Sequence, residues 1–179
     1  MDWNVVVTVR AGPGHEHAVL QGLKALGEFH ATAFKYVCLG RVEDSCAFLD
    51  EVLTAQESAQ PWVAHLARVV PVERVFVCRP EDFVQSFKAA VTPFAARMGD
   101  GRFFVRVERR GQLGRIHTQE AERAAADHLI ELVAARGGRL TTDFRDPDWI
   151  VACETLGGEA GVALLDRPLR ERYPFLQVH

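Results

Sequence analysis

Two periodicities of apolar residues run along the chain: alternation with polar residues, which predicts strands, and a spacing of three to four, which predicts helices. Trp3–Val9 is apolar and β-branched, so it predicts a first, buried strand, which Ala11–Gly14 interrupts. His15–Leu26 carries apolar residues at helical spacing and ends at Gly27, a residue suited to a helix C-terminus. Phe29–Val42 alternates again and predicts one or two strands.

A second helix and further strands complete the first half of the chain. Asp44 or Ser45 suits the start of a helix, which loses its apolar pattern in the polar stretch Gln56–Gln60. Trp62–Val70 and Val72–Cys78 are again strand-like. The resulting order β-α-β-β-α-β is that of a ferredoxin-like domain, which we expect over residues 1–75.

The second half predicts a separate α+β domain over residues 76–179. Pro80 fits the first turn of a helix, where its missing N–H is not needed. In the strand that follows, Val105 points to one face, and Phe104 and Arg106 point to the other. The other expected elements are a strand over Arg102–Arg109, a helix over about residues 119–136, a short strand over Leu140–Phe144, a hairpin of Trp149–Thr155 and Ala160–Leu165, and an irregular tail over Arg167–His179.

The composition is that of a globular protein. Hydrophobic residues make up 48% of the 179 residues and charged residues 25%, which argues against disorder. No apolar run is long enough to span a membrane, and Met1–Asn4 lacks the basic and apolar regions of an export signal. We therefore expect a cytoplasmic protein. The net charge of −3 speaks against a uniformly basic nucleic-acid binder, although net charge averages over different faces.

Candidate metal ligands are present, but their spacing is poor. The four cysteines form no C-x-x-C pair, so we expect buried or idle thiols. His15 and His17 lie two positions apart and would face different directions on a helix. Asp143, Asp146 and Asp148 have the carboxylates that magnesium prefers, but a turn at Asp-Pro-Asp also explains their presence. A small metal-dependent enzyme that uses either set is one alternative.

No motif for covalent, acid–base or nucleotide chemistry is complete. Gly12–Gly14 lacks both the Gly-Lys-Ser/Thr end of a phosphate loop and the third glycine of a dinucleotide loop. His117, His128, Glu120 and Asp127 lack a third partner that would complete a triad. We therefore expect no catalytic activity and no cofactor.

The sharpest signal is a local excess of arginine. Between residues 106 and 117 the chain holds Arg106, Arg109, Arg110 and Arg115 against the single acid Glu108. These side chains and His117 lie at the end of a strand and in the loop before a helix. Guanidinium groups bind phosphate oxygens in pairs, and the free N–H groups at a helix start add an anion site.

At these residues the chain resembles the THUMP family. Phe103–Gly111 (FFVRVERRG) resembles the family's F-x-V-x-x-x-R-x-G strand. The alanine-rich helix and then Thr142–Asp148 resemble the helix and the V-D-L-x-N-P-D segment that follow it, and Trp149–Glu154 resembles the next strand. The resemblance covers about residues 76–172 and keeps the order and spacing of these elements.

The resemblance implies a ferredoxin-like domain followed by a THUMP-like domain that binds the acceptor end of tRNA. The layout is similar to that of the free-standing THUMP adaptor that assists an acetyltransferase modifying a tRNA cytidine. Because the sequence ends at His179 without a methyltransferase, pseudouridine synthase or thiolation domain, we expect a non-catalytic adaptor for a separately encoded tRNA-modifying enzyme. The residues expected to contact RNA are Arg106, Arg109, Arg110, Arg115, His117 and Arg145.

A second alternative also stays open. The acidic net charge fits a protein-interaction or structural module that keeps a THUMP-like fold and no longer binds RNA. The sequence sets neither the tRNA species, nor the partner enzyme, nor the oligomeric state.

Overall fold

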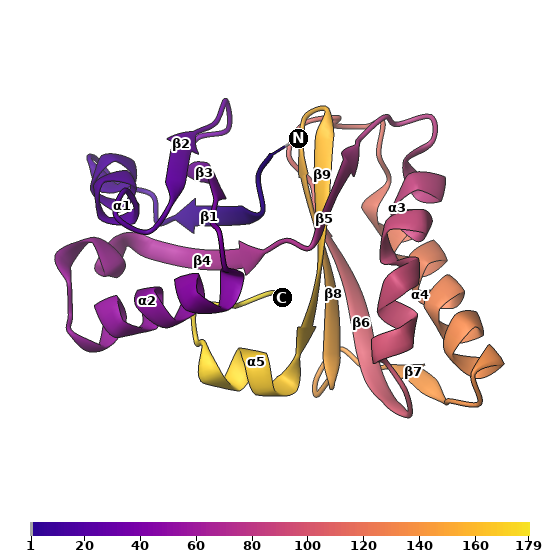
Figure 1. Cartoon of the computed structure of the whole chain (residues 1–179). Coiled ribbons are helices and arrows are strands. Elements are labelled where there is room, and N and C mark those ends of the chain that lie inside the picture. The colour runs from indigo at the N-terminus through magenta and orange to yellow at the C-terminus, as the bar shows by residue number, and fades with distance from the viewer. Residues whose placement is uncertain (1) are drawn as a thin grey trace. The chain divides into compact units, whose positions relative to one another are not determined.

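A computed structural model describes residues 2–179 and shows a mixed α/β chain with two sheets (Figure 1). The chain divides into two compact units. The first unit comprises Asp2–Val72 and Arg170–Gln177, and the second comprises Glu73–Leu169 and Val178–His179. Among residues 2–179, no helix combines the length and the apolar character needed to cross a membrane.

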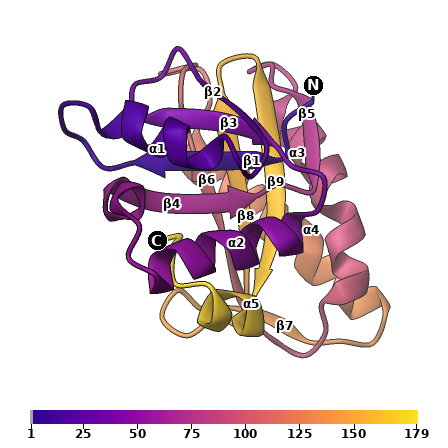
Figure 2. The ribbon, with the colours of Figure 1, turned by 60° about the vertical axis from the view of Figure 1, so that its left-hand side comes forward.

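The first unit has the β-α-β-β-α-β order predicted from the sequence. Its elements are β1 (Val5–Val9), α1 (His15–Leu23), β2 (Glu28–Ala31), β3 (Val37–Arg41), α2 (Ser45–Glu57), the 3-10 helix η1 (Pro61–His65) and β4 (Leu66–Pro71). The strands form an antiparallel sheet in the order β2-β3-β1-β4, and Figure 2 shows β3, β1 and β4 side by side. This is the split arrangement of a ferredoxin-like domain.

Local chemistry explains where two of these elements begin. The Asp44 side chain accepts a hydrogen bond from the Ala47 backbone N–H at 3.0 Å, which satisfies a free donor at the start of α2. Pro61 occupies the first turn of η1, a position that suits proline. The strand expected from Trp62 therefore begins only at Leu66.

The second unit contains a five-stranded mixed sheet. Its elements are β5 (Arg74–Val77), α3 (Phe83–Val91), the 3-10 helix η2 (Thr92–Arg97), β6 (Gly101–Glu108), α4 (Thr118–Ala135), β7 (Leu140–Thr142), β8 (Trp149–Leu156), β9 (Glu159–Asp166) and the start of α5 (Arg167–Arg172). The strand order is β5-β9-β8-β6-β7, and β6 is parallel to both of its neighbours. The hairpin expected around Gly157 is confirmed, since β8 and β9 pair antiparallel.

One face of this sheet carries the core of the second unit. Helices α3 and α4 lie on the same side of β6 (Figure 1). Phe87 of α3 and Phe94 of η2 belong to one buried cluster with Ala125 and Leu129 of α4 and Val105 of β6. The sequence shows the helical spacing of the apolar residues in α3 and α4 and the alternation in β6, which is why these elements could be predicted.

Helix α3 begins later than the sequence indicates. Pro80 was expected to open it, but the helix starts at Phe83. The Asp82 backbone N–H donates to the Arg79 carbonyl at 3.3 Å, and the Arg79 guanidinium pairs with the Asp82 carboxylate at 2.8 Å. These contacts hold residues 79–82 in a turn that precedes the helix.

The division of the chain differs from the predicted 1–75 and 76–179 at two places. The predicted boundary falls inside β5, which begins at Arg74. The segment Arg170–Gln177 belongs to the first unit because the Val69 N–H of the β4 edge donates to the Phe175 carbonyl at 3.0 Å. The tail also contains the helix α5, where no regular structure was expected. Met1 lies outside the described residues.

Candidate nucleic-acid interface

A groove of about 510 Å³ lies in the second unit beside β6 and α4. Strand β7 pairs only with Gly101–Phe103 of β6, so beyond Phe103 that edge of β6 faces the groove instead of a strand. Side chains from β6, α4 and the segment after β7 line it. Those that carry charge, amide or aromatic groups are Arg106, Gln119, Glu122, Arg123, Asp127 and Phe144.

Arg106 projects from β6 into this groove. Its side chain is 33% exposed, and its Nη1 lies 3.7 Å from Glu122 Oε1. The same carboxylate oxygen accepts the Val107 backbone N–H at 2.9 Å, at the unpaired edge of the strand. The Arg106 Nε is buried and has no hydrogen-bond partner among residues 2–179. The Nη atoms form no hydrogen bond within these residues either, so the exposed end of Arg106 keeps unused donors in the groove.

The guanidinium of Arg106 also lies beside two aromatic rings. Its carbon is 5.6 Å from the ring centre of Phe104 and 5.9 Å from that of Phe144. The two rings stack on each other, with centres 5.3 Å apart. Phe104 is buried, whereas Phe144 is 61% exposed. Cation–π contacts of this kind hold the guanidinium in place.

The loop between β6 and α4 holds four of the residues predicted to contact RNA. Arg109 donates from Nη1 to the Ile116 carbonyl at 2.9 Å, so its guanidinium braces the loop. Arg115 is 65% exposed and reaches Glu81 only at 4.0 Å. His117 is exposed, precedes α4, and caps it with no side-chain hydrogen bond. Arg115 and His117 therefore face solvent near the start of α4.

Arg110 does not lie as the sequence predicts. It was expected to project from the strand end toward RNA phosphates. Its side chain is only 11% exposed and donates from Nη1 to Glu154 Oε2 of β8, a carboxylate that is 2% exposed. Because this guanidinium pairs with a buried carboxylate, Arg110 does not belong to the candidate interface.

The three aspartates between β7 and β8 bind two arginines. Arg102 Nη2 lies 2.9 Å from Asp146, and Arg167 pairs with Asp146 at 2.7 Å and with Asp148 at 3.2 Å. Asp143 accepts the backbone N–H groups of residues 145 and 146, at 2.8 and 3.3 Å. These carboxylates therefore accept hydrogen bonds within the turn and form ion pairs with the two arginines. Among residues 2–179, no three histidine, cysteine or acidic residues are placed to hold a metal ion.

These contacts lower the pKa of each aspartate below its ordinary value. For Asp143 the main cause is the hydrogen bond from the Arg145 backbone, and for Asp148 it is the one from the Arg102 backbone. For Asp146 it is the hydrogen bond from the Arg167 side chain. The same contact with Asp146 raises the pKa of Arg167. The arginine and aspartate side chains of the turn thus stabilise each other in their charged forms.

Arg145 follows Phe144 directly and is exposed. Asp143 engages its backbone N–H, and the guanidinium extends from the turn into solvent. Of the predicted residues, Arg106 lines the groove, and Arg145 sits next to the Phe144 that lines it.

The two histidines of α1 form no ligand pair. His15 stacks on His65 with ring centres 3.9 Å apart, and its Nδ1 lies 2.9 Å from the Arg10 carbonyl oxygen. His17 is exposed on the next part of the helix. The His15 contacts hold the loop before α1.

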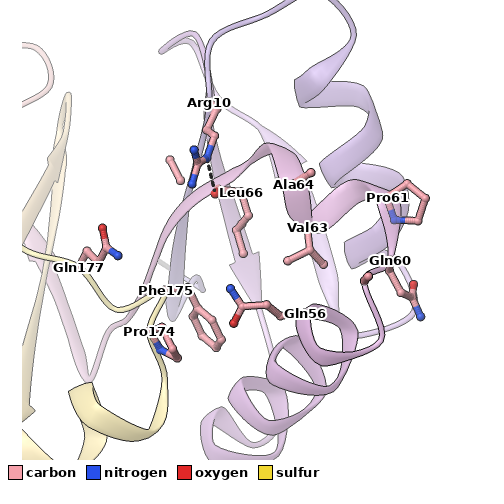
Figure 3. Close-up of a pocket in the computed structure, with 12 residues that line it drawn as sticks. Arg10, Gln56, Gln60, Pro61, Val63, Ala64, Leu66, Pro174, Phe175 and Gln177 are labelled. Carbon is pink, nitrogen blue, oxygen red and sulfur yellow. Dashed lines mark hydrogen bonds between the residues drawn. The ribbon is translucent and has the colours of Figure 1, made fainter.

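A second hollow, of about 440 Å³, lies in the first unit (Figure 3). Gln56, Gln60 and Gln177 contribute amides to it, and Phe175 forms part of its wall. The one cation there is Arg10, whose Nε donates to the Leu66 carbonyl at 3.1 Å, a bond drawn in Figure 3. With one tethered cation and neutral amides, this hollow offers little to a polyanion.

Sequence reasoning missed Phe144, Gln119 and Arg123 as groove residues. Alternation over Leu140–Phe144 predicted a strand, but β7 ends at Thr142, where Asp143 turns the chain. Gln119 and Arg123 lie four positions apart on the polar face of α4, a spacing that places them side by side. An aromatic residue directly before the charged run Arg145–Asp148 was the available signal for Phe144.

No protein-family model matches the chain, and no curated protein matches it. Several solved structures share its fold. PH1313 from Pyrococcus horikoshii aligns with 90% of the chain at 12% identity and a TM-score of 0.61. TrmN from Thermus thermophilus aligns with 96% of the chain at 22% identity and a TM-score of 0.61. A 4-thiouridine synthetase in complex with RNA and ATP aligns with 91% at 12% identity and 0.58.

These alignments cover 54%, 48% and 41% of the respective structures, so the chain spans about half the length of the proteins it resembles. At such identities the likeness shows a shared fold. It agrees with the THUMP-like α+β architecture expected from the sequence.

Proposed function

We propose that the chain binds the acceptor end of tRNA and acts as a non-catalytic adaptor for a separately encoded tRNA-modifying enzyme, such as a cytidine acetyltransferase. The observation that carries the proposal is the groove in which Arg106, whose Nη atoms form no hydrogen bond within residues 2–179, lies beside the exposed ring of Phe144. Guanidinium groups and aromatic faces are the two side-chain types that hold single-stranded nucleic acid.

The likeness to known structures supports the same proposal. One of them is a complex of a 4-thiouridine synthetase with RNA, and the shared fold extends over 91% of this chain. Outside the groove, exposed basic residues of the second unit are Arg115, His117 and Arg145. They provide phosphate contacts, which position RNA and read little of its sequence.

The non-catalytic part of the proposal rests on how the candidate catalytic groups are engaged. The aspartates of residues 143–148 pair with Arg102 and Arg167, and His15 stacks on His65. His128 is hydrogen-bonded to the Thr92 hydroxyl at 2.8 Å, and burial lowers its pKa. We expect no acetyl or methyl transfer when the chain alone is incubated with tRNA and a group donor.

A filter-binding titration tests the proposal directly. The chain is titrated against a tRNA, against the same tRNA without its single-stranded 3′ end, and against a DNA duplex of similar length. We expect the intact tRNA to bind most tightly at low salt. Equal affinity for all three would contradict acceptor-end binding, and failure to bind any of them would contradict RNA binding.

A second function is favoured by a different observation. Several arginines are neutralised by acids within the chain, among them Arg110, Arg102 and Arg167, and the net charge is −3. This charge pattern fits a protein-interaction module that has kept the THUMP-like fold without RNA binding. Binding of the chain to a tRNA-modifying enzyme in the absence of tRNA, together with no tRNA binding, would identify this function.

A further inference from the structure

Phe144 stands out among the aromatic residues of the chain. It is 61% exposed, in a loop that is otherwise charged, while the aromatic rings of the core are buried. The exposed ring is nevertheless fixed: one face stacks on buried Phe104, with ring centres 5.3 Å apart and planes 28° from parallel. The other face is therefore the part of the ring that meets solvent.

The position of this open face is set by the turn beneath it. Asp143 accepts two backbone N–H groups from the residues after Phe144, and Arg102 lies 3.7 Å from the same carboxylate. These contacts fix the backbone on either side of Phe144. A ring held in this way loses little conformational freedom when a ligand stacks on it, which favours binding.

Next to the ring, Arg106 offers hydrogen-bond donors without partners. Its Nη1 lies 3.7 Å from Glu122 Oε1, beyond hydrogen-bond distance, and that carboxylate oxygen already accepts the Val107 N–H. The Nη groups of this partly exposed side chain can face the groove, whereas the buried Nε cannot, so a ligand acceptor would gain a hydrogen bond from Nη that the free protein lacks. Gln119 adds an amide on the α4 side of the groove.

The charges of the groove indicate which part of an RNA fits there. Arg106 and Arg123 are balanced by Glu122 and Asp127, so the groove itself carries no net charge. A phosphate would gain little from such a site. A neutral, planar group with acceptors at its edge would gain both the open ring face and the donors. The volume of about 510 Å³ is in the range of small-ligand sites.

We propose that this groove holds one unpaired base of the bound RNA, stacked on the open face of Phe144 and hydrogen-bonded at its edge by Arg106. The inference rests on the RNA binding proposed above and assigns the groove to a base, while the exposed cations outside the groove contact phosphates. Bases within a duplex are already stacked on one another and cannot enter, so the site selects RNA with a single-stranded segment.

Two substitutions at Phe144 test the assignment. Phe144→Leu keeps an apolar side chain and removes the aromatic face, and Phe144→Tyr keeps the face. Stacking of one base contributes enough that its loss weakens binding about tenfold. We expect Phe144→Leu to lose about that factor for tRNA with its single-stranded 3′ end, and Phe144→Tyr to bind as the parent does. Val77→Ala is the matched control, because Val77 is also exposed but lies in β5, at the opposite edge of the sheet.

Two readouts separate this inference from RNA binding in general. Blunt acceptor duplex should bind the parent and Phe144→Leu equally, and the salt dependence should not change, since no phosphate contact is lost. In tRNA with 2-aminopurine at each unpaired position in turn, fluorescence should fall on binding the parent at one position and stay high with Phe144→Leu. If the parent binds tRNA and Phe144→Leu binds it equally well, the base site is wrong and RNA binding stands. If the parent binds no RNA, both proposals fail.

Discussion

Arg110 donates a hydrogen bond to the carboxylate of Glu154, which lies on the neighbouring strand β8, and Glu154 is buried while the Arg110 side chain is only 11% exposed. The backbone around the pair is also tied, since the Arg110 N–H donates to the Thr155 hydroxyl at 2.9 Å. A cation that the sequence places among the RNA ligands thus fixes the end of β6 to β8. The cost of burying Glu154 as a charged group is offset by this pairing.

The first prediction follows from that pair. Arg110→Ala removes the arginine that pairs with the buried Glu154 carboxylate, and removing one member of a buried ion pair costs about 3–5 kcal/mol. The free energy of unfolding, measured by urea titration, should fall by that amount. Arg115→Ala is the control, because Arg115 is exposed and such substitutions change stability by less than about 0.5 kcal/mol. Equal stability of the two variants would show that the ion pair does not hold the strand.

The second prediction concerns the four cysteines. Cys46 is exposed, whereas Cys38, Cys78 and Cys153 are buried. Burial raises the pKa of Cys38 and of Cys78 to about 11 each and raises that of Cys153 well above its ordinary value. Since the thiolate is the reactive form, one thiol per chain should react quickly with a disulfide reagent at pH 8. All four should react after unfolding. Cys46→Ser should abolish the fast phase.

The same pKa values predict the effect of alkaline pH. An unfolded cysteine ionises near its ordinary pKa of 9.0, but Cys38 and Cys78 stay protonated in the folded chain up to about 11. The folded state thus binds more protons between these values, so the free energy of unfolding should fall as the pH rises from about 9 to about 11. Urea midpoints at pH 8 and pH 10.5 measure this. A Cys38→Ala, Cys78→Ala double variant should show a smaller fall than the parent.

A further prediction concerns the turn that carries Phe144. The pKa of Asp148 is lowered first by the Arg102 backbone N–H and then by the Arg167 side chain, and that of Asp146 chiefly by Arg167. Arg167→Gln should therefore raise the pKa of both carboxyls toward the ordinary 3.8, with the larger change at Asp146. Carboxyl chemical shifts followed by NMR from pH 2 to pH 6 measure it. Because these pKa values are depressed, the network stabilises the fold above pH 3.8 and weakens as the pH falls below it.

Much of the fold followed from local sequence patterns. The first unit has strands and helices with clear period, such as Val5–Val9 and the Asp44-capped α2, so their order could be predicted. In the second unit, β6 and α4 could be predicted from the alternation in β6 and from the stripe of small apolar residues along α4. The helix α5 and the attachment of Phe175 to Val69 depend on contacts between distant residues, which local periodicity does not contain.

In the candidate site, too, some residues could be predicted from the sequence and others could not. Arg106 could be predicted because its place in a strand sets the face on which it lies. Arg110 could not, since its exposure depends on Glu154, a residue from a strand far along the chain. Phe144 was missed because the Asp143 side chain, by accepting two backbone N–H groups, ends β7 and redirects the chain. Side-chain hydrogen bonds of this kind override the apolar pattern of the preceding strand.

The last prediction concerns phosphate contacts outside the groove. Arg115 is exposed with only a 4.0 Å contact to Glu81, and it lies in the loop before the N-terminus of α4. If it binds a phosphate, tRNA binding should weaken with salt, with a slope of log K against log salt of about −0.9 per duplex phosphate neutralised. Arg115→Ala should reduce that slope by about one unit and should weaken different tRNAs equally, because phosphate contacts carry little sequence information. Arg97→Ala is the control, since Arg97 is exposed but paired with Glu73 at 2.8 Å, and its slope should equal that of the parent. A slope unchanged by Arg115→Ala would show that Arg115 contacts no phosphate.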